Sequence, residues 1–363
     1  MITRPKQFTI YSLLLLGMLP GLLLANPSNP QEEDPYKGNT IFQSLKRTNA
    51  LEITIETDLT ELLENRFRDE YQKAAVNYTN AEGEDIQYDL KLRPRGKFRR
   101  RVCDFPPVKL KFPKKQLLSE GYSEHNDLKL VTHCLEDKFE GNENVMKEYL
   151  AYLLFNELSP NSFQVQVVKI TYIDTSKKYG KIKRLGFLIE DTDEMAERLN
   201  GDECDCIGAN INSIVDKDEN LMSIFQYMIG NEDWNTKMAR NLKMVKRNDG
   251  SIIPVPYDFD FSGLVDASYA LPNADYNLVS VKDRIFMGQE VDSGTLGSNI
   301  FLIKNKKKEL YKVVEKFKYL SLDGKAEILT YLDTFYKNIN DLNLLSTGDP
   351  SSSSPDDYNK NLK

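Results

Sequence analysis

The sequence predicts an α+β protein with two lobes, a strand-rich lobe over residues 49–190 and a mostly helical lobe over residues 191–345. Segments with strand patterns dominate the first half, whereas apolar residues recur with helical spacing through most of the second half. A chain of 363 residues is also long enough to bury a substantial core in each lobe.

Both ends of the chain are predicted to lie outside these lobes. Two basic residues precede a long apolar run near the N-terminus, which is the layout of a secretory signal peptide over residues 1–25. An uncleaved N-terminal anchor is the alternative. The polar residues 26–48 predict a linker, and the low-complexity residues 346–363 predict a disordered tail. We therefore expect an exported protein (periplasm, cell surface or secreted) with no transmembrane helix in the mature chain.

The strand-rich lobe is predicted from alternating apolar residues and from one strong helical pattern. The helix at 144–158 ends before Pro160, because the residue before a proline disfavours helical backbone. A second helical pattern covers residues 60–78. The predicted strands cover residues 50–59, 86–101 (a strand that runs into a basic turn at Gly96), 105–112, 126–134, 163–175 and 181–191.

The helical lobe contains one predicted hairpin. Residues 219–230 place apolar side chains on one helical face, and Gly230 is a plausible C-terminal cap. Two strands flank the sequence NDG, a good hairpin turn at residues 248–250. The other predicted helices cover residues 193–200, 300–319 and 322–345.

The four cysteines are an even number, as expected of disulfides in an exported protein. We favour a Cys103–Cys134 pair, because each residue lies at the edge of a predicted strand in the same half of the chain. Cys204 and Cys206 predict a local disulfide or free thiols. A metal site there is the weaker alternative, since no histidine is near.

Two aspartates, Asp258 and Asp260, stand two residues apart at the predicted end of the second hairpin strand. Alternation along a strand would point both carboxylates to one side, with Phe259 and Phe261 on the other. Two like charges so close repel each other unless a cation lies between them or one takes a proton. The pattern therefore indicates a divalent-metal site, with solvated carboxylates at a sheet end as the simpler alternative.

Asp233 and Asn241 belong to the same predicted site, because the hairpin returns the two aspartates towards the loop that carries them. Carboxylate and amide oxygens suit Mg²⁺ or Mn²⁺. The order of helix, aspartate, asparagine, hairpin and aspartate is that of protein-kinase-like enzymes. We predict that Asn241, Asp258 and Asp260 hold the metal. Asp233 is predicted to be catalytic, with capping of a turn as the simpler alternative.

A kinase-like site also needs a strand lysine and a helical glutamate that holds this lysine at the nucleotide. Glu148 lies on a largely apolar face of the predicted helix, so its carboxylate needs a partner. Lys129, on the strand immediately before that helix, is the first choice. Lys111 and Lys109 on the preceding strand are rivals, and each lysine could instead be a solvated surface residue.

A basic turn stands where a glycine-rich nucleotide loop would be expected. No G-x-G-x-x-G motif precedes the second strand, and the chain has RPRGKFRRR at residues 93–101. The residues around the turn that could bind phosphates by charge are Arg95, Lys97, Arg99 and Arg100, and Gly96 at the turn is also predicted to contact the nucleotide. The alternative is a basic turn that docks an acidic partner or surface.

A family resemblance is carried by several segments together: RG followed by FPPVKLKF, then EYLAYLLFNEL, GNEDWNTKMARNLKM and PYDFDFSG. Over most of residues 86–265 the chain resembles the spore-coat protein H (CotH) group of atypical secretory protein kinases, in particular uncharacterised exported bacterial relatives. The resemblance implies export and a two-lobed atypical protein-kinase-like fold with a strand-rich N-lobe and a helical C-lobe. It matches Asp233 to the catalytic-loop aspartate and the DFD pair to the metal-binding aspartates. The family's R-G-N-S-type loop is only partly kept, because Lys97 and Phe98 follow Gly96 here.

We therefore expect an exported kinase that transfers the γ-phosphoryl group of ATP to a protein Ser or Thr hydroxyl. ATP and Mg²⁺ or Mn²⁺ would bind between the lobes, near a hinge at residues 189–191. The protein acceptor follows from the resemblance alone. Two alternatives stay open: AMP transfer by the same fold, and a non-catalytic kinase-like protein for binding or surface assembly. The formal net charge of -7 argues against a nucleic-acid partner.

Overall fold

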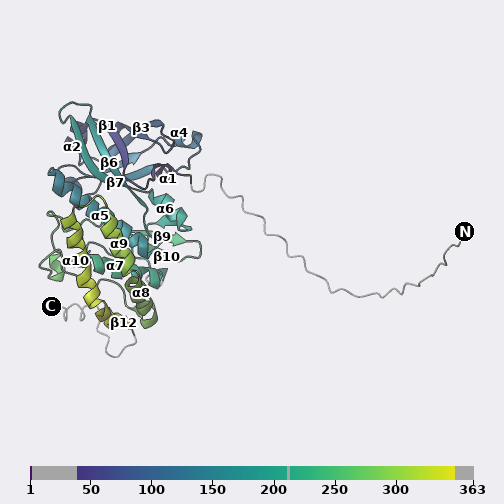
Figure 1. Ribbon diagram of the computed structural model, residues 1–363, viewed down its shortest axis with the longest axis vertical. Coiled ribbons are helices and arrows are strands. Elements are labelled where there is room, and N and C mark those ends of the chain that lie inside the picture. Colours follow the sequence, from purple (N-terminus) through teal and green to yellow (C-terminus); the bar gives the residue numbers. More distant parts are fainter. Residues whose placement is uncertain (2–38, 211–212, 348–363) are drawn as a thin grey trace.

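The computed structural model describes residue 1, residues 39–210 and residues 213–347, and these residues form an α+β protein. A barrel of strands lies at one end of the molecule, and most of the helices lie at the other (Figure 1). The predicted signal peptide beyond its first residue and most of the predicted linker and tail lie outside the described residues. Within the described part of the chain, no helix is long and apolar enough to cross a bilayer.

The barrel has the strand order β1-β2-β3-β4-β5-β7-β6 and closes because β1 also pairs with β6 in parallel. Its strands are β1 Leu51–Thr57, β2 Gln72–Thr79, β3 Asp85–Pro94, β4 Val108–Lys111, β5 Asp127–Val131, β6 Val165–Asp174 and β7 Lys181–Ile189. In β1 and β2, buried side chains alternate with more exposed ones, so every second residue fills the barrel interior. The sequence predicted these strands apart from β2, and it did not predict that the sheet closes.

Residues 60–78, predicted to be one helix, instead belong to a helix and a strand. The helix α2 covers only Leu59–Glu64, and β2 follows after a turn. Ala74, Val76 and Tyr78 are buried at every second position of β2. Because β2 pairs with β1 on one side and β3 on the other, the hydrogen bonds of the barrel outweigh the helical spacing. Two further short helices join barrel strands, α3 Arg99–Val102 and α4 Lys114–Ser119.

The last part of the predicted linker is folded, as the helix α1 (Ile41–Leu45). Its apolar side chains Ile41, Phe42 and Leu45 are at most 2% exposed and pack into the core of the barrel. The linker prediction is therefore wrong for this segment. The surrounding polar composition concealed three apolar residues that lie on one face of a single helical turn.

The helix α5 (Lys138–Leu158) lies between the barrel and the other helices (Figure 1). The predicted helix at 144–158 is confirmed and begins earlier, at an N-cap formed by Asp137. Every residue from Asn144 to Tyr152 is buried, because the barrel covers one side of α5 and helices cover the other. This position carries Glu148 into the interior of the molecule.

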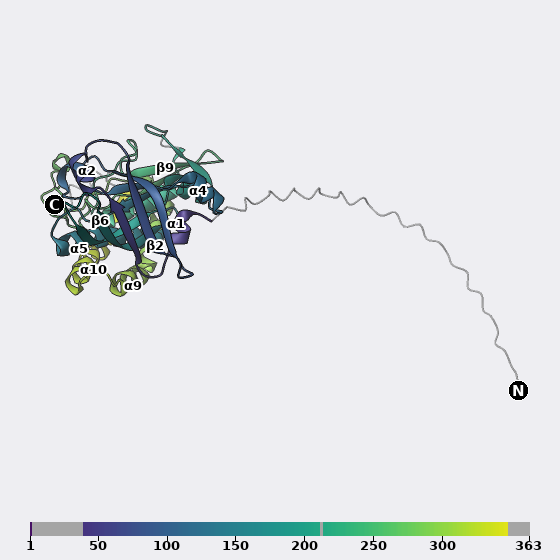
Figure 2. The same cartoon turned by 90° about the horizontal axis from the view of Figure 1, so that it is seen from above.

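The rest of the described chain is mainly helical. The helices are α6 Thr192–Arg198, α7 Asp216–Ile229, α8 Ser293–Asn305, α9 Lys307–Lys316 and α10 Leu322–Asn338, with the 3-10 helices η2 Ala274–Tyr276 and η3 Ile339–Leu345. The strands are β8 Gly201–Cys204, β9 Leu242–Arg247 and β10 Ile252–Pro256, which form one sheet, and the short pair β11 Val291–Asp292 and β12 Ser346–Thr347. The predicted hairpin is thus confirmed. Seen from above, α9 and α10 extend past one edge of the barrel (Figure 2).

The helix α7 ends at Gly230, as its sequence predicts. Gly230 has a left-handed backbone, with φ 62° and ψ 41°. A Cβ atom at this position would lie 2.0 Å from the hydroxyl of Tyr331 on α10, so a larger residue would have to displace that tyrosine. The sharp turn sends the following residues into the loop that carries Asp233.

Both cysteine pairs form disulfides. The predicted Cys103–Cys134 bond is confirmed and joins the end of α3 to the segment that leads into α5. Cys204 and Cys206 form the second, local disulfide. Because disulfides persist in oxidising compartments, the two bonds indicate an extracytoplasmic location.

Candidate functional site

Asp258 and Asp260 reach one site for a reason other than strand alternation. The strand β10 ends at Pro256, and Asp258 has a left-handed backbone with φ 65°. Its N–H donates to the Tyr152 hydroxyl at 2.9 Å. Between the aspartates, Phe259 is fully buried, and its ring centre lies 4.7 Å from that of Tyr152. The buried phenylalanine thus anchors the turn, and both carboxylates extend away from it.

The two carboxylates meet Arg99, which comes from α3 on the other side of the site. The Arg99 Nη2 atom lies 2.8 Å from Glu148 Oε2 and 3.0 Å from Asp258 Oδ1, and its Nε lies 2.8 Å from Asp260 Oδ2. Arg99 is 5% exposed, Glu148 1% and Asp260 3%. The Tyr269 hydroxyl donates to Asp260 at 3.2 Å. One guanidinium therefore holds three carboxylates, two of which are buried.

The cluster contains three carboxyl groups and only one basic group, and most of these groups are buried. Burial raises the pKa of Glu148 and of Asp260, against the opposing effect of Arg99. Burial alone would lower the pKa of Arg99, but Asp260, Glu148 and Asp258 outweigh it and raise that pKa. Three carboxylates share one cation, so the cluster favours additional positive charge.

Asp233 and Asn241 form a separate pair beside the cluster. The Asn241 side-chain amide donates to the backbone carbonyl of Asp233 at 2.6 Å and to its Oδ2 at 2.9 Å. The Arg240 Nε lies 3.5 Å from the other Asp233 carboxylate oxygen. Burial, assisted by the nearby DFD carboxylates, raises the pKa of Asp233 although Arg240 opposes the shift. Asp233 is therefore oriented by fixed donors and is a stronger base than an ordinary aspartate.

These groups open onto one cavity of about 530 Å³. Asp233 and Asn241 line it from one loop, Asp258 and Asp260 from another, and residues 96–99 of the basic turn from a third. The Phe98 and Phe261 rings, in edge contact at 5.0 Å, also border it. The structure thus brings together residues that are far apart in the sequence, such as Arg99 and Asp258, which are 159 positions apart.

The predicted pairing of Lys129 with Glu148 is wrong, because Glu148 pairs with Arg99 instead. Lys129 donates to the Thr192 hydroxyl at 2.6 Å, and its Nζ lies 5.0 Å from the centre of the Phe163 ring. Burial is the main cause that lowers the pKa of Lys129 to about 7. The lysine therefore lies at the junction of β5 with α6, while the basic turn reaches across to α5.

The rival lysines on β4 point elsewhere. The Lys109 Nζ forms an ion pair with Asp127 at 2.5 Å. Lys111 is exposed, and its Nζ lies 5.7 Å from the centre of the Tyr71 ring. Neither lysine contacts Glu148 or lines the cavity described above.

Of the residues predicted at the basic turn, Arg99 alone enters the carboxylate cluster. Gly96 has φ 78°, a conformation that suits glycine, and it lines the cavity. The charge of Arg95 adds to burial in lowering the pKa of Lys129, which shows that Arg95 lies near that lysine. The sequence indicated a basic region here but not which arginine turns inward.

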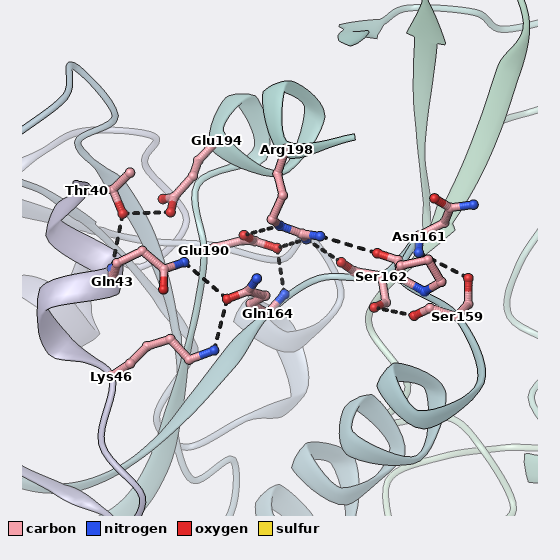
Figure 3. Close-up of polar contacts among 11 residues, drawn as sticks. Thr40, Gln43, Lys46, Ser159, Asn161, Ser162, Gln164, Glu190, Glu194 and Arg198 are labelled. Carbon is pink, nitrogen blue, oxygen red and sulfur yellow. Dashed lines mark hydrogen bonds and ion pairs between the residues drawn. The ribbon is translucent and has the colours of Figure 1, made fainter. Parts of the chain in front are cut away.

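The predicted hinge residues 189–191 occupy the junction between β7 and α6. Glu190 is fully buried there, and Arg198 of α6 bonds to it at 2.6 Å (Figure 3). The Glu190 Oε1 also accepts from the backbone N–H of Gln164 at 2.6 Å. Burial raises the pKa of Glu190, and Arg198 opposes the shift. This junction is therefore held by a paired, buried charge; hinge motion stays a prediction.

The residues present fit a hard divalent cation. One oxygen each from Glu148, Asp258 and Asp260 lies within 4.8 Å of the other two, and carboxylate oxygens are the ligands that Mg²⁺ and Mn²⁺ prefer. The buried Glu148 Oε1 has no hydrogen-bond partner in the described part of the chain. The predicted ligand Asn241 lines the same cavity, but its amide is turned to Asp233. Sequence reasoning missed Glu148 as a neighbour of the DFD aspartates.

One sequence signal could have located Glu148 more closely. Tyr152 follows Glu148 by four residues on α5, so the two side chains lie on the same helical face. Tyr152 binds the backbone of Asp258, and Glu148 shares Arg99 with the same aspartate. A tyrosine and a glutamate at this spacing on a buried face therefore indicated two polar contacts with one partner segment.

Comparison with known proteins adds no assignment to this geometry. No protein-family model matches the chain, and no curated protein matches it. The case for a function therefore rests on the residues of the cavity and on the chemistry that they support.

Proposed function

We propose that the chain is an exported atypical kinase, which transfers the γ-phosphoryl group of ATP to a protein Ser or Thr hydroxyl with the help of Mg²⁺ or Mn²⁺. One observation carries the proposal: the Asp233–Asn241 pair and the carboxylates of Asp258 and Asp260 open onto one cavity beside a basic turn. Phosphoryl transfer needs little covalent chemistry from the protein. It needs positioning and charge stabilisation, and these groups supply both.

Each residue has a role that follows from its position. Asp233, at the half-exposed side of the cavity, would orient the acceptor hydroxyl and take its proton, while Asn241 holds its carboxylate in place. Asp258, Asp260 and Glu148 would hold the divalent ion, which supplies Lewis-acid charge stabilisation at the phosphates when bound. Arg95 and Lys129, which lie near the junction with α6 and outside the lining of this cavity, would orient the nucleotide.

The fold is compatible with this proposal. The barrel with α5 would serve as the N-lobe of a kinase-like fold, and the part from α6 onwards would serve as the C-lobe. The two disulfides support an exported kinase. The order along the chain, with α5 before the Asp233 loop and the DFD turn after the hairpin, also supports it.

A second candidate is favoured by one specific observation. Arg99 already neutralises part of the carboxylate cluster and is almost completely buried. A non-catalytic kinase-like protein would keep such an internal ion pair permanently, as a structural replacement for metal. AMP transfer would need the same bound nucleotide and metal ion at this site as phosphoryl transfer, so only the labelling experiment distinguishes the two reactions.

The test uses the exported protein with its disulfides intact. We expect its melting temperature to rise with ATP plus Mg²⁺ or Mn²⁺, and we expect radiolabel from γ-labelled but not α-labelled ATP to appear on protein. Label from α-labelled ATP would establish AMP transfer instead. The absence of both a thermal shift and label transfer would contradict the enzyme and favour the non-catalytic candidate. Asp233→Asn is the matched control for label transfer.

A further inference from the structure

The three carboxylates of Glu148, Asp258 and Asp260 already have a cation, and it is part of the chain. We propose that Arg99 is a positioning residue that competes with a divalent metal ion for the oxygen atoms of Asp258 and Asp260. The inference rests on the proposed function, because it assumes that a metal ion binds at this cluster. It adds that the metal site is closed by Arg99 until that side chain releases the aspartates.

The contact geometry makes the two cations mutually exclusive. Two nitrogens of Arg99 lie 2.8 to 3.0 Å from one oxygen of each carboxylate. Those oxygens belong to the same groups that approach within 4.8 Å of one another. A guanidinium and a divalent ion carry like charge, so both cannot lie among these three groups without strong repulsion.

A separate observation shows that Arg99 does not saturate the cluster. The Glu148 Oε1 atom has no hydrogen-bond partner among the described residues, although Glu148 is 1% exposed. A buried carboxylate oxygen without a partner is costly, because it has lost water and gained nothing. With three carboxyl groups and one guanidinium, the cluster also has an excess of negative charge once its carboxyl groups are ionised. A divalent ion would compensate more of this charge than Arg99 does.

The backbone fixes Arg99 at the cluster, so the exchange involves its side chain. Arg99 begins α3, which ends at Val102, and the disulfide ties the next residue, Cys103, to Cys134 just before α5. The helix α5 carries Glu148. The arginine and the glutamate are therefore linked through one covalent bridge. Arg99 can release the carboxylates, because the long side chain moves without the backbone.

The consequence is that metal alone should bind weakly to the wild-type chain. The cost of moving Arg99 off Asp258 and Asp260 is subtracted from the affinity for the ion. When phosphate groups are present, the released guanidinium has a new anionic partner with matching geometry. Arg99 would thus couple metal binding to nucleotide binding, which is a linkage between two ligands at one site.

The experiment measures Mn²⁺ binding to the full-length chain without nucleotide, by the electron paramagnetic resonance signal of free Mn²⁺. We expect Arg99→Ala to bind Mn²⁺ at least about tenfold more tightly than wild type, since the competing charge is gone. Arg99→Lys should fall between them, because the shorter lysine keeps the charge but lacks the planar fork with which the guanidinium reaches the three carboxylates. Arg101→Ala, an exposed change of the same charge in α3, should equal wild type.

The opposite results would overturn the proposal. A merely structural Arg99 predicts that Arg99→Ala loses stability and binds Mn²⁺ no more tightly, or less tightly, than wild type. If Arg99→Ala does not fold, the comparison of wild type with Arg99→Lys decides, and equal affinities refute competition. Because no nucleotide or label transfer enters this measurement, tighter Mn²⁺ binding would stand even if the chain proved unable to transfer phosphate.

Discussion

Asp258 and Asn241 both have left-handed backbone conformations, with φ 65° and 51°. Aspartate and asparagine tolerate this region better than other non-glycine residues. Such conformations persist only where the surroundings hold them, and here the Tyr152 hydroxyl binds the Asp258 N–H. At the residue scale, aspartate and asparagine therefore suit these two positions for two reasons: they tolerate the left-handed backbone, and their side chains supply the oxygen atoms of the site.

The DFD aspartates and Asp233 should respond differently to the same substitution. We expect Asp258→Asn to leave the ligand-free protein within about 1 kcal/mol of wild type, because asparagine tolerates the left-handed backbone and the cluster has excess negative charge. It should lose most of the thermal stabilisation by ATP and metal. Asp233→Asn should keep that stabilisation and lose label transfer. Melting curves without ligand, with metal, and with metal plus ATP separate these outcomes; a large loss without ligand would mean that Asp258 is structural.

The strand lysine gives a second comparison with a matched control. We expect Lys129→Met to remove most of the nucleotide-dependent thermal shift and to leave the fold intact, because this amine near Arg95, whose pKa is lowered to about 7, would take a proton beside a bound phosphate and orient it. Lys111→Met on the neighbouring strand should change neither, since Lys111 is exposed beside Tyr71. Thermal shift with ATP and Mn²⁺ measures both. If Lys111→Met removed the thermal shift and Lys129→Met did not, the nucleotide would bind at the outer face of β4 instead.

At the scale of elements, α3 and α5 act as one unit. The Cys103–Cys134 disulfide joins them across 31 positions of sequence, and backbone N–H groups of Asp104 and Phe105 donate to the Cys134 carbonyl. α3 supplies Arg99, and α5 supplies Glu148. The short helix is thus held at the site by covalent attachment, because four residues alone are too few for a stable helix.

Removing this disulfide should destabilise the protein measurably. We expect Cys103→Ser with Cys134→Ser to lower the free energy of unfolding by about 3 to 4 kcal/mol, from the chain entropy of the loop that the bond closes. The pair Cys204→Ser with Cys206→Ser should cost less, because that loop is only two residues long. Urea unfolding followed by circular dichroism measures both. Equal losses would show that loop closure is not the source of the stability.

At the scale of the whole molecule, α1 connects the barrel to the helical part. Its apolar side chains fill the barrel core, while the Thr40 hydroxyl donates to Glu194 of α6 at 2.6 Å (Figure 3). Gln43 and Lys46 both contact the Gln164 side-chain oxygen. A short segment near the start of the described chain therefore fixes the orientation of α6 relative to the barrel, next to the cavity-forming loops.

This junction makes stability depend on pH in a defined direction. Burial raises the pKa of Glu194 to about 7, against the effect of the Thr40 hydrogen bond. The folded state therefore holds this proton more tightly than the unfolded state, whose pKa is near 4.5, and stability falls as pH rises from 4.5 to 7. Glu194→Gln lacks this loss, so its free energy of unfolding relative to wild type should increase over that range, by up to about 3 kcal/mol. If the free energy of unfolding changed with pH in the same way for both proteins, a raised pKa of Glu194 in the folded state would be contradicted.

The sequence by itself determined the α+β class, six of the seven barrel strands, the β9–β10 hairpin, the helices α5, α6 and α7 and the Gly230 cap, and it favoured the Cys103–Cys134 pairing. These features depend on the spacing of apolar residues, on turn-forming residues and on the position of cysteines along predicted strands, all of which can be recognised in short segments of sequence. It also singled out Asp258 and Asp260 as a pair that needs a cation, because repulsion between adjacent charges is a local property.

Only the tertiary structure decided which cation that pair receives. Arg99 is one of several basic residues in its turn, and nothing local distinguishes the one that turns inward from its neighbours. The choice depends on β3 and β4 being paired, on the disulfide at Cys103 and on the depth of Glu148 in α5. For the same reason, β2 was mistaken for helix: its hydrogen bonds are made to β1, which precedes it, and to β3, which follows it, and such pairing between strands is not visible in the spacing of apolar residues within one segment.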